Sequence, residues 1–210
     1  MFEPAIEQLL AELEELGREN DERVSERRYR LLNLERPTAE LMWLLMQSSR
    51  RRNVLEIGTS NGYSTIWLAE ALRRTPDARF ISIERFPEKL AQARKNLDRA
   101  GLLASVELIE GDATEIVRSL VSPQRAKDGR VGDPGSPFDC VFFDADRVSA
   151  PAQLEILLPK LAPDALLLAD NVLSHPQEVA EYRKMVECLP GFIWTVIAVG
   201  KGLHIAWRKS

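Results

Sequence analysis

Oxygen-bearing side chains follow two apolar segments in the second half of the chain. Residues 138–143 read FDCVFF and precede Asp144, and residues 165–169 read ALLLA and precede Asp170 and Asn171. Strands buried on both faces have this composition, and neighbouring parallel strands end at the same edge of a sheet. We therefore expect Asp144 beside Asp170 and Asn171, where three hard oxygen donors suit Mg²⁺ or Ca²⁺. The ordinary alternative is a set of helix caps and turn formers.

A glycine-containing turn provides the second candidate site. Residues 54–64 read VLEIGTSNGYS, a strand that turns at Gly58 and Gly62 into a helix and leaves room for a ligand over the helix N-terminus. Ser60 stands where a dinucleotide fingerprint has its second glycine, and the stretch is no phosphate loop, so a pyrophosphate ligand is disfavoured. Glu56, at the end of the strand, suits a ligand that carries an ammonium group. The alternative is an ordinary glycine turn.

Two further acids end the next predicted strands. Glu84 closes the strand in FISIERFPE, where an acidic residue can accept hydrogen bonds from both hydroxyls of a ribose. Asp112, in IEGDA, ends the following strand, where it could meet the edge of an adenine. The alternative for Glu84 is a solvated residue before a helix. With the glycine turn, these acids indicate a nucleoside site without a cradle for pyrophosphate.

Alternating strands and helices must position these residues. Apolar residues at helical spacing from Ile6 to Leu16 predict a first helix that stops at Gly17, and Pro37 opens a second apolar helix. The strands predicted after it are residues 53–57, 79–83, 105–109, 138–143 and 165–169. The helices predicted with them are residues 62–73, 87–100, 113–120, 148–158 and 175–188. Strands separated by helices imply right-handed crossovers and a parallel sheet with helices on both faces.

The last part of the chain breaks this alternation. Residues 192–199 and 203–207 predict two strands whose connection, Gly200-Lys201-Gly202, is too short for a crossover, so they form an antiparallel hairpin. The expected fold class is α/β: a Rossmann-like, doubly wound, mostly parallel seven-stranded sheet with a C-terminal antiparallel hairpin and N-terminal helices. Residues 122–137 contain three prolines and three glycines and predict a flexible surface insertion before the fourth strand.

The composition argues against several classes of partner. The 210 residues carry a formal net charge of −4, so no basic surface suggests a nucleic acid, and no apolar run reaches the ~20 residues of a membrane span. The first residues are acidic, unlike a cationic secretory or transit signal. Cys140 and Cys188 are the two cysteines, and we expect both to be buried free thiols in a reducing cytoplasm.

From about Leu31 to Trp207 the chain resembles the cation-dependent O-methyltransferases, the group that contains catechol and caffeoyl-coenzyme A O-methyltransferases. The stretches LEIGTSNGYS, SIER, EGDA, FFDADR and ADNV follow the family's motifs in order and spacing, and GKGLHIA resembles its closing hairpin. The resemblance implies a class I S-adenosylmethionine-dependent methyltransferase, because five parallel strands closed by a hairpin are the arrangement of that class. The length of the chain suits one domain over residues 1–210, which we divide into an N-terminal helical cap at 1–50 and a cofactor-binding core at 51–210.

The same resemblance implies roles for individual residues. In that family S-adenosylmethionine lies over the first glycine turn, and the metal ligands fall on Asp144, Asp170 and Asn171 of this chain. The residues implied to bind the cofactor are Glu56, Gly58, Ser60 and Ser64 around its methionine part, Glu84 at its ribose, Asp112 and Ala113 at its adenine, and Gly62 of the glycine turn. The implied cofactors are S-adenosylmethionine and a divalent cation, Mg²⁺ or Ca²⁺. Asp144 and Arg147 are the implied catalytic residues.

Two departures from the family pattern concern the acceptor. Where the family commonly reads Asp-x-x-Lys, with a Lys thought to take the acceptor proton, this chain has Arg147. A guanidinium is effectively never deprotonated, so Arg147 cannot be a general base, although it can stabilise a phenolate. His175 is a candidate proton acceptor, or only a residue at the start of the helix opened by Pro176. The chain also lacks the insertion that covers the acceptor in plant caffeoyl enzymes, so we expect an acceptor unlike caffeoyl-coenzyme A.

The leading hypothesis is methyl transfer from S-adenosylmethionine to one hydroxyl of a small catechol-like, vicinal dihydroxy acceptor. The alternatives are a metal-independent small-molecule methyltransferase and a non-catalytic cofactor-binding protein. We expect a homodimer without a nucleic-acid or membrane partner, and the acidic first helix is either a dimer element or a cap over the cofactor. Met42 and Trp43 are core residues or line the acceptor pocket, and His204 is a core or edge residue.

Overall fold

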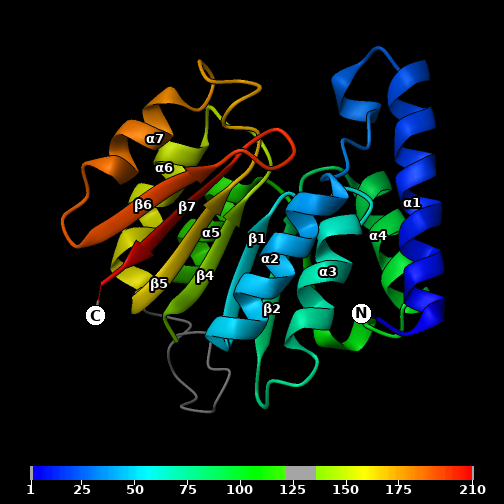
Figure 1. The fold of residues 1–210 in the computed structure, drawn as a ribbon, viewed down its shortest axis with the longest axis horizontal. Helices are drawn as coiled ribbons and strands as arrows, with labels where there is room; N and C mark the ends of the chain where they lie inside the picture. Colours follow the sequence, from blue (N-terminus) through cyan, green and yellow to red (C-terminus); the bar gives the residue numbers. More distant parts are fainter. Residues whose placement is uncertain (1, 122–135, 210) are drawn as a thin grey trace.

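The computed structural model describes residues 2–121 and 136–209, and it has three layers: helices, a seven-stranded sheet and helices again (Figure 1). The strand order is β3-β2-β1-β4-β5-β7-β6, in which the first five strands of the chain are parallel and the last two antiparallel. The expected fold class is confirmed. Most of the predicted insertion, residues 122–135, lies outside the described residues.

The bounds of the elements follow the predicted alternation closely. The strands are β1 (Asn53–Ile57), β2 (Arg79–Glu84), β3 (Glu107–Glu110), β4 (Phe138–Phe143), β5 (Leu161–Ala169), β6 (Phe192–Ile197) and β7 (Leu203–Arg208). The helices are α1 (Pro4–Arg23), α2 (Arg36–Ser49), α3 (Tyr63–Leu72), α4 (Pro87–Arg99), α5 (Ala113–Val121), α6 (Ala150–Leu157) and α7 (Ala180–Glu187). A short 3₁₀ helix, η1 (Arg27–Tyr29), lies between α1 and α2.

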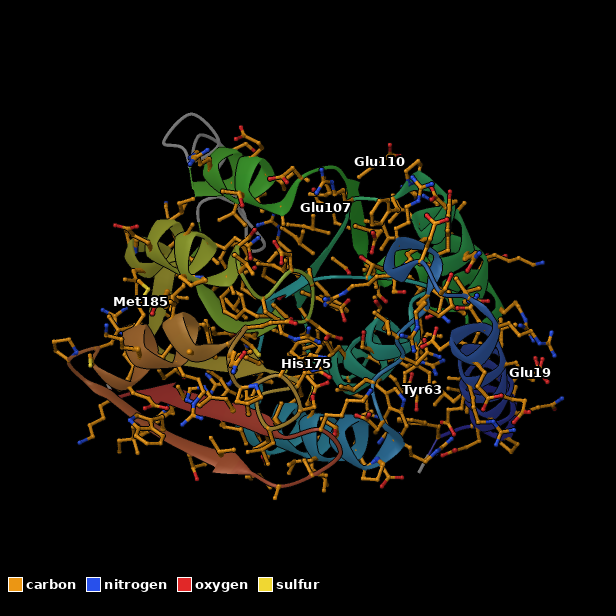
Figure 2. All side chains as sticks on the ribbon, turned by 90° about the horizontal axis from the view of Figure 1, so that it is seen from above. Glu19, Tyr63, Glu107, Glu110, His175 and Met185 are labelled. Atoms are coloured by element: carbon orange, nitrogen blue, oxygen red, sulfur yellow. The ribbon has the colours of Figure 1, made fainter. Side chains whose placement is uncertain are left out.

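The central strands are buried on both faces, as their uninterrupted apolar sequences predict. Successive side chains of a strand point to opposite faces. Val54 therefore packs with α1 to α4, whereas Leu55 and Ile57 pack with α5, α6 and α7. Figure 1 shows α2 and α3 in front of the sheet and α1 standing at its side. Figure 2 views the molecule from above, onto the edge where the parallel strands end.

The first helix is longer than predicted, because α1 continues through Gly17 to Arg23. A Cβ added at Gly17 would lie 2.5 Å from Nδ2 of Asn33. The same Asn33 amide donates a hydrogen bond to the carbonyl oxygen of Leu13 at 2.7 Å. Gly17 therefore admits the close approach of a following segment and does not end the helix.

The apolar stripe of α1 is used within this chain. Ile6, Leu9, Leu10 and Leu13 are buried in the core beside α2 and α3. On its acidic side, Glu14 accepts hydrogen bonds from the Tyr63 hydroxyl at 2.7 Å and from Nε of Arg36 at 2.9 Å. This helix is thus anchored to the fold, which leaves it little apolar surface for a dimer contact.

Other predictions fail locally. The strand expected at 105–109 begins at Glu107, because residues 103–105 form a 3₁₀ turn. The helix expected at 175–188 begins at Ala180, because Val172 and Leu173 donate their N–H groups to the carbonyls of the β6–β7 loop.

Cys188 is exposed just past the end of α7, whereas Cys140 is buried. Among the described helices, none combines the length and apolar character needed to cross a membrane.

Candidate active site

Gly58 lies at the carboxyl edge of the sheet, where the ends of β1 and β2 meet the end of β4. Its N–H donates to the carbonyl of Ile83 at 2.9 Å, while the N–H of Asp144 donates to the carbonyl of Ile57 at 2.9 Å. Gly58 has φ +111°, and a Cβ there would lie 2.5 Å from the carbonyl oxygen of Asp144. A side chain is therefore excluded, and the glycine turn and the end of β4 are held in contact.

The carboxylate of Glu56 is enclosed beneath the turn. It is fully buried and accepts hydrogen bonds at 2.6 Å from the hydroxyls of Ser64, Thr65 and Ser82. Burial raises its pKa, an effect that the three hydroxyl hydrogen bonds oppose. Glu56 therefore fixes the start of α3 against β2, and a ligand would meet Ser64 before it met Glu56.

Glu84 is held beside the turn by backbone groups. Its Oε2 accepts a hydrogen bond from the N–H of Ser60 at 2.7 Å, and its Oε1 accepts one from the N–H of Phe86 at 2.9 Å. Ser60 has φ +48°, and its hydroxyl donates to the carbonyl of Leu31 at 2.7 Å. The segment before α2 is thereby attached to the glycine turn, a contact that the sequence does not reveal.

The remaining predicted cofactor residues lie at helix starts. Gly62, with φ +87°, precedes α3. A Cβ added to Gly62 would lie 3.2 Å from the Cα of Ala93. Asp112 accepts a hydrogen bond from the N–H of Thr114 at 3.0 Å at the start of α5, where Ala113 is the first residue. Asp112 thus acts as a helix cap in this structure, and it stays exposed at the carboxyl edge of the sheet.

The metal ligands suggested by the sequence lie together at the ends of β4 and β5. Phe143 pairs with Ala169, so Asp144 and Asp170 follow neighbouring strands in register. Asn171 has φ +67°, and its amide donates a hydrogen bond to Oδ2 of Asp170 at 2.8 Å. The other oxygen of Asp170, Oδ1, is buried and has no hydrogen-bond partner among residues 2–121 and 136–209.

The surroundings of these two carboxylates raise the pKa of both. Burial raises the pKa of Asp170 to about 6 and, together with the neighbouring Asp170, raises the pKa of Asp144 above its usual range. In the described part of the chain, no three His, Cys, Asp or Glu side chains gather closely enough to hold a metal, and the third donor here is the amide of Asn171. Two carboxylates, one of them with an unsatisfied oxygen, and an amide suit a hard divalent cation that also keeps water ligands.

Arg147 lies beside this edge but bonds elsewhere. Its Nη1 donates a hydrogen bond to Oε2 of Glu178 at 2.7 Å, and Arg27 of η1 lies 3.7 Å from the same oxygen. Arg147 and Asp170 line one small cavity together with Tyr182. Its guanidinium opposes the rise in the pKa of Asp144 and Asp170. Neither Glu178 nor Arg27 was recognised from the sequence, because their partners are remote along the chain.

A second cation comes from the hairpin loop. The ammonium of Lys201 lies 2.7 Å from Oε1 of Glu35, just before α2, and it too lowers the pKa of Asp144 and Asp170. The carbonyl of Lys201 accepts hydrogen bonds from Leu173 at 3.0 Å and from the next N–H at 3.2 Å. The loop therefore braces the segment that carries the predicted metal ligands.

The two histidines differ in environment. Figure 2 shows His175 near the middle of the carboxyl edge, where its Nδ1 lies 2.8 Å from the hydroxyl of Ser174. It belongs to a turn before α7, not to a helix. His204 is fully buried beside Tyr182, so the expected core position is correct for it. Met42 is buried in the core, and the partly buried Trp43 packs against the same core cluster.

Known proteins that are similar to this chain are methyltransferases. The methyltransferase domain family matches residues 55–172. A catechol O-methyltransferase of Niastella koreensis is 38% identical over 134 residues, which cover 64% of this chain and 55% of that protein. A catechol O-methyltransferase of Mycobacterium tuberculosis is 34% identical over 142 residues, which cover 68% of this chain and 58% of that protein.

A solved structure extends the comparison over the whole chain. The O-methyltransferase TomG of Streptomyces achromogenes, involved in tomaymycin synthesis and crystallised with S-adenosylmethionine, is similar with a TM-score of 0.78 and 27% identity. The alignment covers 100% of this chain and 92% of that one. By contrast, the chain spans a little over half the length of the two curated relatives that it matches.

Proposed function

The chain belongs to the class I S-adenosylmethionine-dependent O-methyltransferases, and from this membership we propose that it methylates one hydroxyl of a small vicinal dihydroxy acceptor with the help of a divalent cation. The unsatisfied, buried Oδ1 of Asp170 is the observation that carries the cation part of the proposal. A buried oxygen without a partner is costly, and a cation bound there would remove the cost.

The cofactor would lie over the glycine turn of β1. A carboxylate has about four acceptor positions, and the two backbone N–H groups leave Glu84 able to accept both hydroxyls of a ribose. Ser60 and Ser64 would face the methionine part, with Glu56 holding Ser64 from below. Asp112 and Ala113, at the start of α5, would border the adenine.

The residues of β4 and β5 would hold the cation and orient the acceptor. Asp144, Asp170 and Asn171 are its proposed ligands, with Mg²⁺ or Ca²⁺ as the ion. When bound, such an ion lowers the pKa of a coordinated hydroxyl and can hold both oxygens of a vicinal diol. Arg147 would stabilise the negative charge on the acceptor oxygen, and the enclosing residues would place that oxygen in line with the methyl group.

Exposed apolar side chains support an aromatic acceptor. Tyr29, Leu32, Val148 and Leu173 are among the large hydrophobic residues that remain exposed. Val148 follows Arg147 directly, and Leu173 comes two residues after Asn171, so both are close in sequence to the proposed metal site. Leu32 follows the residue that accepts the Ser60 hydroxyl. A planar apolar ring would cover such side chains and thereby gain binding energy.

We also propose a homodimer in the cytoplasm. Ile193, Ile197 and Trp207 are exposed on one face of the β6–β7 hairpin, on the side opposite α7. A second copy could cover this face, and sedimentation of the wild-type chain and of Trp207→Ser would test it. The acidic composition and the two unpaired cysteines support the compartment and a small-molecule acceptor without a nucleic-acid partner.

Methylation of a panel of catechols with and without EDTA tests the proposal. Turnover with Mg²⁺ that stops in EDTA is the expected result. Turnover that EDTA leaves unchanged would instead favour a metal-independent methyltransferase. Binding of S-adenosylmethionine without turnover of any acceptor would favour a non-catalytic cofactor-binding protein. Arg147, in the position where the family commonly has a Lys, is the feature that supports this alternative.

A further inference from the structure

Two guanidinium groups at the rim of the proposed acceptor site share one carboxylate. Arg27 and Arg147 both point to Oε2 of Glu178, at 3.7 and 2.7 Å. Arg147 takes the hydrogen bond, and Arg27 keeps only the longer contact, which is its one ion pair among the described residues. A guanidinium presents five N–H donors, so one shared carboxylate oxygen leaves most of those on Arg27 free.

These two arginines reach the rim from opposite sides. Arg147 follows β4 and lines the same cavity as Asp170. Arg27 belongs to η1, four residues before Leu31, whose carbonyl is bound to the glycine turn through Ser60. Their shared partner Glu178 thus connects the segment that is attached to the glycine turn with the end of β4.

We propose that the acceptor carries a carboxylate in addition to its vicinal hydroxyls, and that Arg27 binds this carboxylate in competition with Glu178. The inference rests on the proposed function. Within that function the charge on Asp144 and Asp170 is balanced by a divalent cation, and the ionised hydroxyl meets the sulfonium of the cofactor. The positive charge of Arg27 remains without a carboxylate of its own. The side chain of Arg27 is 58% exposed, so its guanidinium is accessible to an anionic group that binds in a bidentate manner.

Protocatechuate and its neutral carboxamide form a matched pair of probes, since both carry the same vicinal hydroxyls. We expect wild-type protein to prefer protocatechuate in kcat/KM by about five- to tenfold, the range for a partly exposed charge-assisted hydrogen bond. The ratio should fall towards one in Arg27→Gln. It should rise in Glu178→Gln, because the competing carboxylate is gone. High salt should reduce it, as expected for an exposed ion pair.

Arg28→Gln is the control variant. Arg28 is adjacent, similarly exposed at 56%, and is paired with Glu26 at 3.3 Å and stacked on Tyr29. It should leave the ratio at its wild-type value. Equal use of both probes by wild-type protein, or the same change in the ratio for Arg27→Gln and Arg28→Gln, would overturn the proposal.

Calorimetry separates this inference from the proposed function. With S-adenosylhomocysteine and Mg²⁺ present, the ratio of the two dissociation constants should follow the same order among the variants. If neither probe is methylated, the proposed function fails, while the binding ratio still decides about Arg27. Equal dissociation constants for the two probes would reject the carboxylate site even if both were methylated.

Discussion

The two halves of the sheet edge treat their buried carboxylates differently. At the ends of β1 and β2, Glu56 accepts three hydroxyl hydrogen bonds and Glu84 accepts two backbone hydrogen bonds. At the ends of β4 and β5, Asp170 receives one hydrogen bond from its neighbour Asn171, and its other oxygen is buried without a partner in the described chain. The pKa of Asp170 is raised to about 6 as a result of burial.

This difference indicates which half is complete without a ligand. The carboxylates of the first half are satisfied by the protein, so a cofactor would add contacts to a finished framework. The second half keeps negative charge out of water with only partial compensation from Arg147 and Lys201, an arrangement that costs stability. Such an arrangement is typical of functional sites, and a cation would supply what the protein lacks.

The largest expected effect is that of Asp170→Ala on catalysis. Methyl transfer should fall by at least about a thousandfold, roughly 4 kcal/mol, because a cation contributes several kcal/mol to charge stabilisation. Binding of S-adenosylhomocysteine should persist, because Glu84 and Ser60 lie on the other half. Rates at saturating substrate and calorimetry check the two statements.

Asp146→Ala is the control for Asp170→Ala. Asp146 is an exposed acid near the same edge that accepts a hydrogen bond from the Ser149 hydroxyl at 2.6 Å. Its loss should lower stability by about 0.5–2 kcal/mol, as for a helix cap, and leave most of the rate. If Asp170→Ala behaved in the same way, Asp170 would be a structural residue only.

The next effect joins both halves. Gly58→Ala should destabilise the fold by about 3 kcal/mol or more, because the residue has positive φ and its Cβ would lie 2.5 Å from the Asp144 carbonyl oxygen. Gly101→Ala is the matched variant, with φ +67° and no atom within 4 Å of the added Cβ, and it should cost about 1 kcal/mol. Urea unfolding of both measures the gap, and equal costs would show that the halves are not in close contact there.

A smaller effect concerns pH. Burial lowers the pKa of His204 from 6.5 to about 4, with Glu187 opposing and Arg183 adding to the shift. Its neighbour Tyr182 stays neutral, because burial raises the pKa of that hydroxyl. In the unfolded chain His204 is protonated below about pH 6.5, whereas in the folded chain it is protonated only below about pH 4. The free energy of unfolding therefore decreases as the pH is lowered through this window, by up to about 3 kcal/mol at its lower end.

His204→Phe isolates this contribution. The variant has no imidazole to titrate, so the difference in unfolding free energy between pH 6.5 and pH 4 should be smaller than in wild-type protein by that amount. An unchanged difference would mean that His204 is accessible to protons in the folded state. Denaturant titrations at both pH values provide the test.

The smallest expected effect is that of Glu84→Ala. Cofactor affinity should drop by about 1–3 kcal/mol, the range for losing hydrogen bonds to a charged group, while Mg²⁺ binding on the other half should not change. Glu110→Ala is the control, since Glu110 pairs in register with Glu84 at the same edge and is exposed. A loss of affinity that is equal in both variants would point to general surface charge and not to a ribose contact.

The alternation of strands and helices could be predicted because each buried strand is a short apolar run bounded by turn residues. Errors arose where a distant segment decides the local structure. Gly17 reads as a helix stop, but it makes room for Asn33. The helix expected from residue 175 starts at Ala180, because the preceding turn is bonded to the β6–β7 loop.

The positions of the candidate site residues at the sheet edge could be predicted from the sequence, whereas their hydrogen-bond and ion-pair partners could not. Strand ends locate Asp144 and Asp170 at one edge because the carboxyl ends of parallel strands meet there. The partners of charged side chains do not follow from spacing. Glu178 meets Arg147 and Lys201 meets Glu35 only once the turn before α7 and the hairpin loop are in place.

Titration of Mg²⁺ into the protein with S-adenosylhomocysteine present tests the central claim, that the second half of the edge is a cation site. Calorimetry and thermal unfolding should be measured for wild-type protein and Asp170→Ala. We predict one bound ion per chain and a rise in Tm with Mg²⁺ for the wild type, and neither for Asp170→Ala, while S-adenosylhomocysteine stabilises both. A wild-type protein indifferent to Mg²⁺, or an equal response of both proteins, would contradict it.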